Sequence, residues 1–289
     1  MLENNARARS PLLPWPSEWG SQRPPGKLVA GLVVFGAAAI VAIPYVIVSG
    51  KNGNTVGAVS GFAGGLVALS FVAIFAPHMR VRRTKLPRDI HSDDDGLRIL
   101  YLSSWAYVVM GWLAAAVAFL LMRGALFLVQ LSERDDSGDA TIRGAGLATV
   151  LVASVMAVSI IWYLISGKHR RGTFVLGQDG VLLAFGGAVR NISWDELGDV
   201  SPCIVNNSRV IRITPAPGSV IHVQSGRSLL DRLQRSYHEQ NMDLHSWVMG
   251  IDPSLLLHLV RYYWQNPDVR QELISEAVIE RVLRGELVS

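Results

Sequence analysis

The chain has 289 residues, of which 50% are hydrophobic and only 17% are charged, and its mean hydropathy is +0.30. Soluble globular domains average about 25% charged residues, so this composition excludes a disordered chain and argues against an ordinary soluble enzyme. Cys203 is the single cysteine, which excludes both a disulfide framework and a cysteine-based zinc site.

A proline-rich tail occupies residues 1–27. Its five prolines disfavour helix and sheet, and Trp15 and Trp19 accompany them. We expect this tail to be mobile, or to lie along lipid headgroups with the tryptophans inserted between them.

Three stretches that follow the tail are almost free of charge. Residues 28–76 contain one charge, Lys51, and residues 99–122 and 144–167 contain none. A membrane-spanning helix needs about 20 apolar residues, so the pattern predicts a four-helix transmembrane domain over residues 28–167. Its helices are expected at residues 28–48, 55–76, 99–122 and 146–166.

Lysine and arginine are distributed unevenly around these four segments. Thirteen lie before the first segment, between the second and third, and directly after the fourth, against four on the other side. Basic residues mark the cytoplasmic side of a membrane protein, so both termini are expected in the cytoplasm. Seven of these residues are expected to contact lipid headgroups: Arg80, Arg82, Arg83, Lys85, Lys168, Arg170 and Arg171. The basic surplus belongs wholly to residues 1–167, so nucleic acid is not an expected partner.

The second segment carries small residues at a helical spacing. Gly53, Gly57, Gly61 and Gly65 recur every four residues and form one stripe. Such a stripe lets two helices approach closely, and we interpret it as packing within the bundle, with a dimer seam as the alternative. Pro44 is expected to kink the first helix. The predicted spans contain no Asp, Glu, Lys, Arg or His, which argues against a pump or a proton-coupled transporter.

The loop between the second and third segments contains His91 and the run Asp93-Asp94-Asp95. These oxygen-rich side chains are potential ligands for a divalent cation, although the spacing of a calcium loop is absent. We interpret the run instead as a solvated cap at the start of the third helix.

After Arg171 the hydrophobic pattern changes from helical to strand-like. Short strands are expected at residues 173–176, 180–185, 189–194, 200–205, 210–214, 219–224 and 245–251. Closely spaced strands joined by turns predict a small antiparallel sandwich or barrel, with Pro202 at a sheet edge. Asp252 is expected to cap a helix over residues 253–264, and a last helical stretch covers 267–284.

Seven short strands closed by an amphipathic helix are similar to a pleckstrin-homology-like domain, as found in multi-pass actinobacterial membrane proteins. The resemblance rests on residues 178–181, 192–197 with Val200, and 259–267 with 270–273. It implies an α+β cytoplasmic domain over residues 168–284, with Trp194 and Trp264 in its core, and a place in the bacterial inner membrane. It assigns no reaction. The first hairpin, residues 176–181, has no basic residue, so phosphoinositide binding by that hairpin is not expected.

No catalytic motif accompanies this architecture. The sequence has no Gly-x-Ser-x-Gly elbow, phosphate-binding loop or His-Glu-x-x-His motif, so no enzyme, cofactor or metal site is expected. The leading hypothesis is a membrane protein whose cytoplasmic domain docks a protein partner or a second copy. An exposed sheet edge or the groove beside helix 253–264 is the expected contact surface. The alternative is a protein that handles lipid or a small amphiphile near Pro44 and the glycines.

Overall fold

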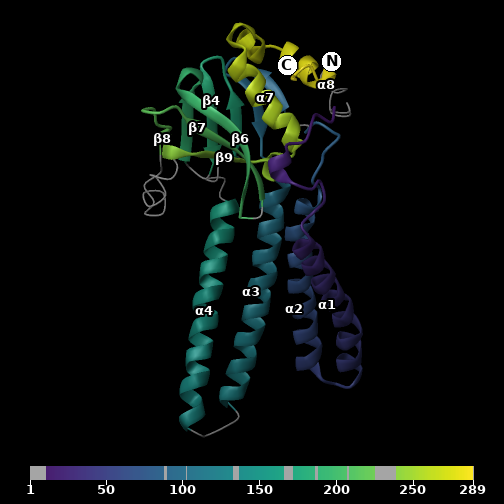
Figure 1. Ribbon diagram of the computed structural model, residues 1–289. Coiled ribbons are helices and arrows are strands. Elements are labelled where there is room, and N and C mark those ends of the chain that lie inside the picture. Colours follow the sequence, from purple (N-terminus) through teal and green to yellow (C-terminus); the bar gives the residue numbers. More distant parts are fainter. Residues whose placement is uncertain are drawn as a thin grey trace. The chain divides into compact units, whose positions relative to one another are not determined.

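A computed structural model of the chain describes residues 11–87, 90–101, 103–132, 137–165, 172–185, 188–206, 208–224 and 239–288 (Figure 1). The chain divides into two compact units. One, here called the β unit, comprises Met1–Pro24, Arg80–Ser103 and Arg170–Ser289. The other, the helical unit, comprises Pro25–Met79 and Ser104–His169. The predicted division at residues 27 and 167 therefore differs from the observed one, because the tail and the loop before the third helix belong to the β unit.

Four long helices account for most of the helical unit. They are α1 (Gly26–Lys51), α2 (Thr55–Phe75), α3 (Ser103–Ser132) and α4 (Ser137–Ile165). Among the described residues, α1 and α2 are the helices long and apolar enough to cross a membrane. The expected start of the third helix at Ile99 is wrong, because Ile99 and Leu100 belong to a strand.

Helices α1 and α2 pack together through the predicted glycine stripe. A Cβ atom at Gly61 would lie 2.5 Å from the ring of Tyr45, and one at Gly65 would lie 3.0 Å from the Cβ of Ala42. The phenyl rings of Phe35 and Phe71 stack with their centroids 4.6 Å apart. Gly61 and Gly65 therefore lie where α1 and α2 approach each other. Gly53 is the exception, since it lies in the turn before α2 with a φ of +70°.

The β unit contains two antiparallel sheets (Figure 1). The first has the order β1-β2-β3-β4-β5-β8 and the second the order β6-β7-β9. The strands of the first sheet are β1 (Ile90–Asp93), β2 (Gly96–Leu100), β3 (Thr173–Leu176), β4 (Gly180–Phe185), β5 (Ala188–Ser193) and β8 (His222–Gln224). Those of the second are β6 (Leu197–Val205), β7 (Ser208–Pro215) and β9 (Met242–His245). Pro202 lies on β6, an edge strand as expected.

The acidic run before the third helix forms a hairpin rather than a helix cap. Asp94 and Asp95 make the turn between β1 and β2, and Gly96 follows with a φ of +129°, which a residue with a Cβ rarely adopts. Strand β2 then pairs with β3, where Ile99 lies opposite Phe174. The hairpin therefore extends the sheet that the later strands begin.

Helices at the end of the chain pack on both sheets. Helix α7 (Pro253–Gln265) packs on β6 and β7, and the guanidinium of Arg261 donates to the carbonyl oxygen of Val200 at 2.9 Å. Asp252 caps α7 by accepting from the backbone N–H groups of Ser254 and Leu255, as the sequence predicts. The last segment comprises the 3₁₀ helix η5 (Pro267–Ile274) and the helix α8 (Ala277–Arg284), which pack against β1 and β2 of the first sheet.

The structure confirms one expectation for this region and corrects two others. Trp194 is 2% exposed and lies in the core as expected, with its indole N–H donating to the carbonyl oxygen of Gly177 at 2.9 Å. Trp264 is only partly buried, and the neighbouring Tyr263 is the core residue, at 0% exposure. The strand expected at 245–251 ends at His245, where the short helix α6 (Ser246–Met249) begins.

Candidate functional site

One face of the six-stranded sheet carries a row of side chains that crosses all six strands. The registers pair His91 with Arg98, Arg98 with Val175, Val175 with Leu182, Leu182 with Asn191, and Asn191 with His222. Side chains alternate between the two faces of a strand, so this row lies opposite the buried set that includes Leu97, Phe174 and Leu183. The sheet thus has one apolar face toward the core and a second face, here called the polar face, that is polar at its two sides and apolar in the middle, at Val175 (6% exposed) and Leu182.

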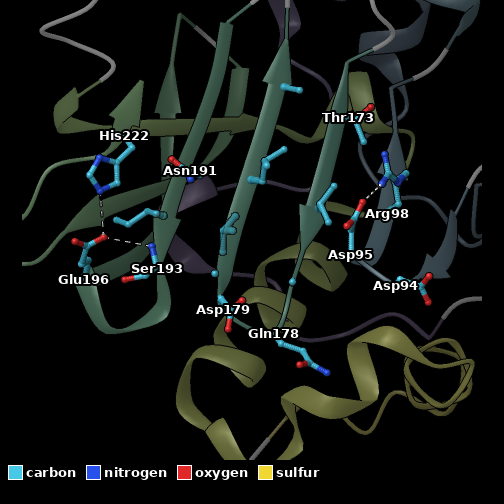
Figure 2. Close-up of a pocket in the computed structure, with 17 residues that line it drawn as sticks. Asp94, Asp95, Arg98, Thr173, Gln178, Asp179, Asn191, Ser193, Glu196 and His222 are labelled. Carbon is cyan, nitrogen blue, oxygen red and sulfur yellow. Dashed lines mark hydrogen bonds and ion pairs between the residues drawn. The ribbon is translucent and has the colours of Figure 1, made fainter. Parts of the chain in front are cut away.

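The polar face is hollowed into a cleft of about 880 Å³ (Figure 2). Asp94 and Asp95 come from the β1–β2 turn, Gln178 and Asp179 from the β3–β4 turn, and Glu196 from the 3₁₀ helix η4 (Trp194–Glu196) that follows β5. Antiparallel pairing brings these three turns to the same end of the sheet. We call this surface the sheet-face cleft.

Negative charge predominates along the sheet-face cleft. Four carboxylates line it, from Asp94, Asp95, Asp179 and Glu196, against a single guanidinium, that of Arg98. Arg98 is already engaged, since its Nε lies 2.8 Å from Asp93 and its Nη2 lies 2.9 Å from Asp95. The remaining carboxylate charge favours a cationic ligand.

Glu196, Ser193 and His222 form a small network on the β5–β8 side of the cleft. The Oε2 atom of Glu196 lies 4.0 Å from Nε2 of His222 and accepts a hydrogen bond of 3.4 Å from the backbone N–H of Ser193 (Figure 2). Asn191 lies beside His222 and is exposed. Its side-chain amide provides donors and an acceptor for a bound peptide.

Among the described residues there is no group of three or more His, Cys, Asp and Glu side chains placed to hold a metal ion. The run Asp93-Asp94-Asp95 instead holds the Arg98 guanidinium and caps its own turn, where the backbone N–H of Asp95 donates to Oδ1 of Asp93 at 3.0 Å. Cys203, in β6, has a thiol pKa raised by burial, which lowers its reactivity.

The groove beside α7, which the sequence proposes as a contact surface, is occupied by the chain's own tail. Trp19 is 2% exposed, and its indole N–H donates to the carbonyl oxygens of Cys203 at 3.0 Å and Val210 at 3.2 Å. Nε2 of His258 in α7 lies 3.2 Å from the carbonyl oxygen of Pro14. The expectation of a mobile or lipid-bound tail is therefore wrong for residues 11–24.

The basic residues assigned to lipid headgroups divide into three groups. Arg82 is committed within the β unit, since its Nε lies 3.0 Å from the buried carboxylate of Asp252 and its Nη2 donates to the carbonyl oxygen of Leu13 at 3.1 Å. Arg83 is partly buried, and this burial lowers its pKa. Arg80 and Lys85 are exposed. Lys168, Arg170 and Arg171, which the sequence also assigned to lipid headgroups, lie outside the described residues.

A second hollow lies within the helical unit, between α1 and α2. It has a volume of about 470 Å³ and an apolar lining that includes Ile43, Val46, Gly61, Phe62 and Gly65.

Comparison with known proteins adds no assignment: no family model, curated protein or solved structure matches the chain.

The sequence analysis did not identify the sheet-face cleft, although one signal for part of it was present. In the segment Gly96-Leu97-Arg98-Ile99-Leu100, apolar Leu97 and Ile99 flank Arg98, which is the alternation of a half-buried strand. The adjacent acidic run directed the interpretation toward a solvated loop. The cleft also depends on pairing between β2 and β3, which local patterns do not reveal.

Proposed function

We propose that this protein is a non-enzymatic integral membrane protein, whose four helices anchor the β unit as a docking module at the cytoplasmic face. The observation that supports the proposal best is the sheet-face cleft, a hollow of about 880 Å³ with an excess of carboxylates. The pleckstrin-homology-like resemblance remains part of the proposal, and two antiparallel sheets with α7 packed on one of them are compatible with it.

Exposed apolar side chains support the membrane part of the proposal. On α1, Val33, Ile40 and Val41 are 66%, 68% and 65% exposed, and on α4 Val155 is 65% exposed. Contiguous apolar surface of this kind is rare on soluble monomers. At 1.5 Å per residue, the 30 residues of α3 and the 29 of α4 are long enough to cross about 30 Å of hydrocarbon. We propose that all four helices span the membrane, with both termini in the cytoplasm.

The partner that we propose for the cleft is a basic, extended segment of another protein. The β1–β2 and β3–β4 turns are centred two strand spacings apart, about 10 Å, which is also the length of three extended residues. The end of β5 lies about one and a half spacings, or about 7 Å, beyond the β3–β4 turn. A peptide with lysine at every third position therefore brings ammonium groups to the β1–β2 turn, to Asp179 and to Glu196, with the flexible lysine side chain accommodating the shorter second distance. Arg98 already pairs with Asp95, so Asp94 supplies the carboxylate at the first turn. An anionic lipid headgroup would meet these carboxylates with unfavourable charge.

A titration tests this partner class. The full chain in detergent is titrated with a fluorescent peptide carrying lysine at every third position between serine and valine. Peptides with the lysines in one block, or with glutamate in their place, are the controls. The proposal expects the spaced-lysine peptide to bind at least tenfold more tightly than either control at low salt. Asp179→Lys should abolish this preference, while Asp268→Lys, an exposed site on η5, should retain it. Equal binding of the three peptides would overturn the partner class.

Cysteine labelling tests the membrane topology. In a Cys203→Ser background, Asn54→Cys in the α1–α2 turn and Ser289→Cys at the C-terminus report opposite sides in the proposed topology. A membrane-impermeant maleimide added to intact cells should label the first variant only. Labelling of the C-terminal site before permeabilisation would contradict a cytoplasmic β unit.

Binding of a small amphiphile is a second candidate function, favoured by the 470 Å³ apolar hollow between α1 and α2. Its size and lining suit an acyl chain. Native mass spectrometry of the gently extracted protein should then show one lipid bound at a fixed stoichiometry. Gly65→Leu should lose this lipid, because the new side chain enters the hollow. The control Gly31→Leu should retain it, since a Cβ at Gly31 meets no atom within 4 Å. A protein without a stoichiometric lipid would exclude this second function.

A further inference from the structure

The N-terminal segment 11–24, here called the tail segment, is held by the β unit at two tryptophans. Trp19 is the more deeply placed, and its indole N–H is shared between carbonyl oxygens on the neighbouring strands β6 and β7. Trp15 packs on it, with ring centroids 5.1 Å apart. The guanidinium carbons of Arg82 and Arg209 lie 5.1 and 5.3 Å from the Trp15 ring centroid. Such cation–π contacts are attractive and selective for aromatic residues.

Side chains of the β unit also bind backbone carbonyl groups along the tail segment. Arg82 donates to Leu13, and Arg209 donates to Ser21 at 2.7 Å and to Arg23 at 3.0 Å. His258 contacts the carbonyl oxygen of Pro14. The tail segment contains one 3₁₀ turn, η2 (Ser17–Trp19), closed by the backbone N–H of Gly20, which donates to the carbonyl oxygen of Ser17 at 2.8 Å. The four carbonyl groups that contact side chains of the β unit lie on either side of this turn.

Residues outside the tail segment, in α7 and in the segment before β1, hold the Arg82 guanidinium in place. The Asp252 carboxylate, itself unexposed, accepts from the backbone N–H of Arg83 at 3.0 Å and pairs with Nε of Arg82. Arg82 Nη1 also lies 3.3 Å from the hydroxyl of Ser254. The guanidinium that meets Leu13 and Trp15 is therefore oriented by groups outside the tail segment. A preoriented cation beside an aromatic pocket is the arrangement that peptide-binding grooves use.

We propose that the groove formed by α7, Arg82 and the β6–β7 hairpin is a recognition site for a Pro-Trp segment with one 3₁₀ turn, and that the tail segment is its built-in ligand. The contacts combine two buried or half-buried tryptophans with side-chain hydrogen bonds to backbone carbonyls, which is how a separate peptide is held. The chain therefore blocks its own groove. A free peptide of the same chemistry gains access only when the tail segment is released. This inference is independent of the sheet-face cleft, which lies on the other sheet.

The test begins with a folded, full-length protein. A specific protease site is inserted between Gln22 and Arg23, both of which are exposed, and the chain is cut after purification. A fluorescent peptide with the sequence of residues 9–22 is then added, and its binding is followed by anisotropy. The uncut chain is the matched control for groove access. A peptide with Trp19→Ala is the control for specificity, and the spaced-lysine peptide monitors the sheet-face cleft separately.

The proposal expects the labelled peptide to exchange into the cut chain and to bind the uncut chain at least tenfold more weakly. The Trp19→Ala peptide should lose about a hundredfold or more in affinity. Binding of the spaced-lysine peptide should be unchanged by cutting, so failure at one surface is distinguished from failure at the other. Two results would overturn the proposal: a cut chain that retains its original segment without exchange, or one that loses its folded state when cut. Either would make the tail segment a part of the core.

Discussion

The indole N–H of Trp19 donates to the carbonyl oxygen of Val210 at 3.2 Å, a contact between residues 191 positions apart. It places the start of the chain on the strand pair β6–β7, beside α7. Because α1 begins at Gly26, only residues 20–25 separate this anchor from the first apolar helix. The segment that leads into the helical unit is thus docked on the β unit.

Replacement of Trp19 should destabilise the β unit far more than replacement of Trp15. Trp19→Ala removes a side chain that is 2% exposed, and the expected cost is about 3–5 kcal/mol in the free energy of unfolding. Trp15 is only partly buried, so Trp15→Ala should cost about 1 kcal/mol, mainly from its cation–π contacts. Chemical denaturation of the detergent-solubilised protein measures both. Equal losses of unfolding free energy in the two variants would contradict the deeper placement of Trp19.

Asp252 joins the start of α7 to the segment before β1, and its replacement should destabilise the β unit. Asp252→Ala removes the cap of α7 and leaves the Arg82 guanidinium without its carboxylate, at an expected cost of about 3–5 kcal/mol. Asp252→Asn retains one capping oxygen and should cost less. Asp268→Ala on exposed η5 is the control, expected to stay within about 0.5 kcal/mol of the wild type. An Asp252→Ala variant as stable as this control would exclude the bridging role.

The β unit should lose stability as the pH falls below about 6.5. Burial lowers the pKa of both His245 and His258 from the ordinary value of 6.5, so the folded state disfavours the protonated rings. Arg190 near His245 and Arg261 near His258 act in the same direction, while Asp243 and the Pro14 carbonyl oppose it. The unfolded chain then binds protons that the folded chain does not, and acid favours unfolding.

Thermal unfolding at pH 7.5, 6.5 and 5.5 measures this dependence. His245→Gln and His258→Gln each remove one titrating group and keep a polar side chain, so the drop in Tm between pH 7.5 and 5.5 should be smaller in each variant. A wild-type Tm that rises on acidification would contradict the direction of both pKa shifts.

Alanine at Gly61 should weaken the packing of α1 on α2. Its Cβ would lie 2.5 Å from the Tyr45 ring, and the strain of such overpacking costs about 1–3 kcal/mol. Gly64→Ala on the same helix is the matched control, since a Cβ there meets no atom within 4 Å. Resistance of the folded protein to dodecyl sulfate compares the two. If both variants unfold at the same detergent fraction, the glycine stripe does not serve this contact.

Local signals in the sequence predicted the elements that depend on neighbouring residues. The residues Gln178-Asp179-Gly180 form a turn between apolar runs, and β3 and β4 have the expected bounds. The cap at Asp252 was predicted for the same reason. Helix α1 was expected at residues 28–48 and runs over Gly26–Lys51, because charge-free composition defines its middle better than its ends.

The missed features depend on contacts between distant segments. Strand β2 pairs with a strand that follows two intervening long helices, and nothing local to Arg98 indicates that partner. The proline-rich tail has no hydrophobic period, so its docking through Trp19 was not predictable from pattern. The short apolar run that contains Val248 and Met249 is compatible with strand or helix, and tertiary packing selects the helix.

Photo-crosslinking in intact membranes tests the docking account most directly. A photoreactive amino acid replaces Asn191, which is exposed in the sheet-face cleft, and in a control replaces Ile204, which is 55% exposed on β6. The account predicts an adduct at position 191 with a lysine- or arginine-rich segment of another protein. That adduct should be weakened by Asp179→Lys and absent at position 204. Adducts of equal yield at both positions, or an adduct at position 191 with a segment that carries no basic residues, would contradict it.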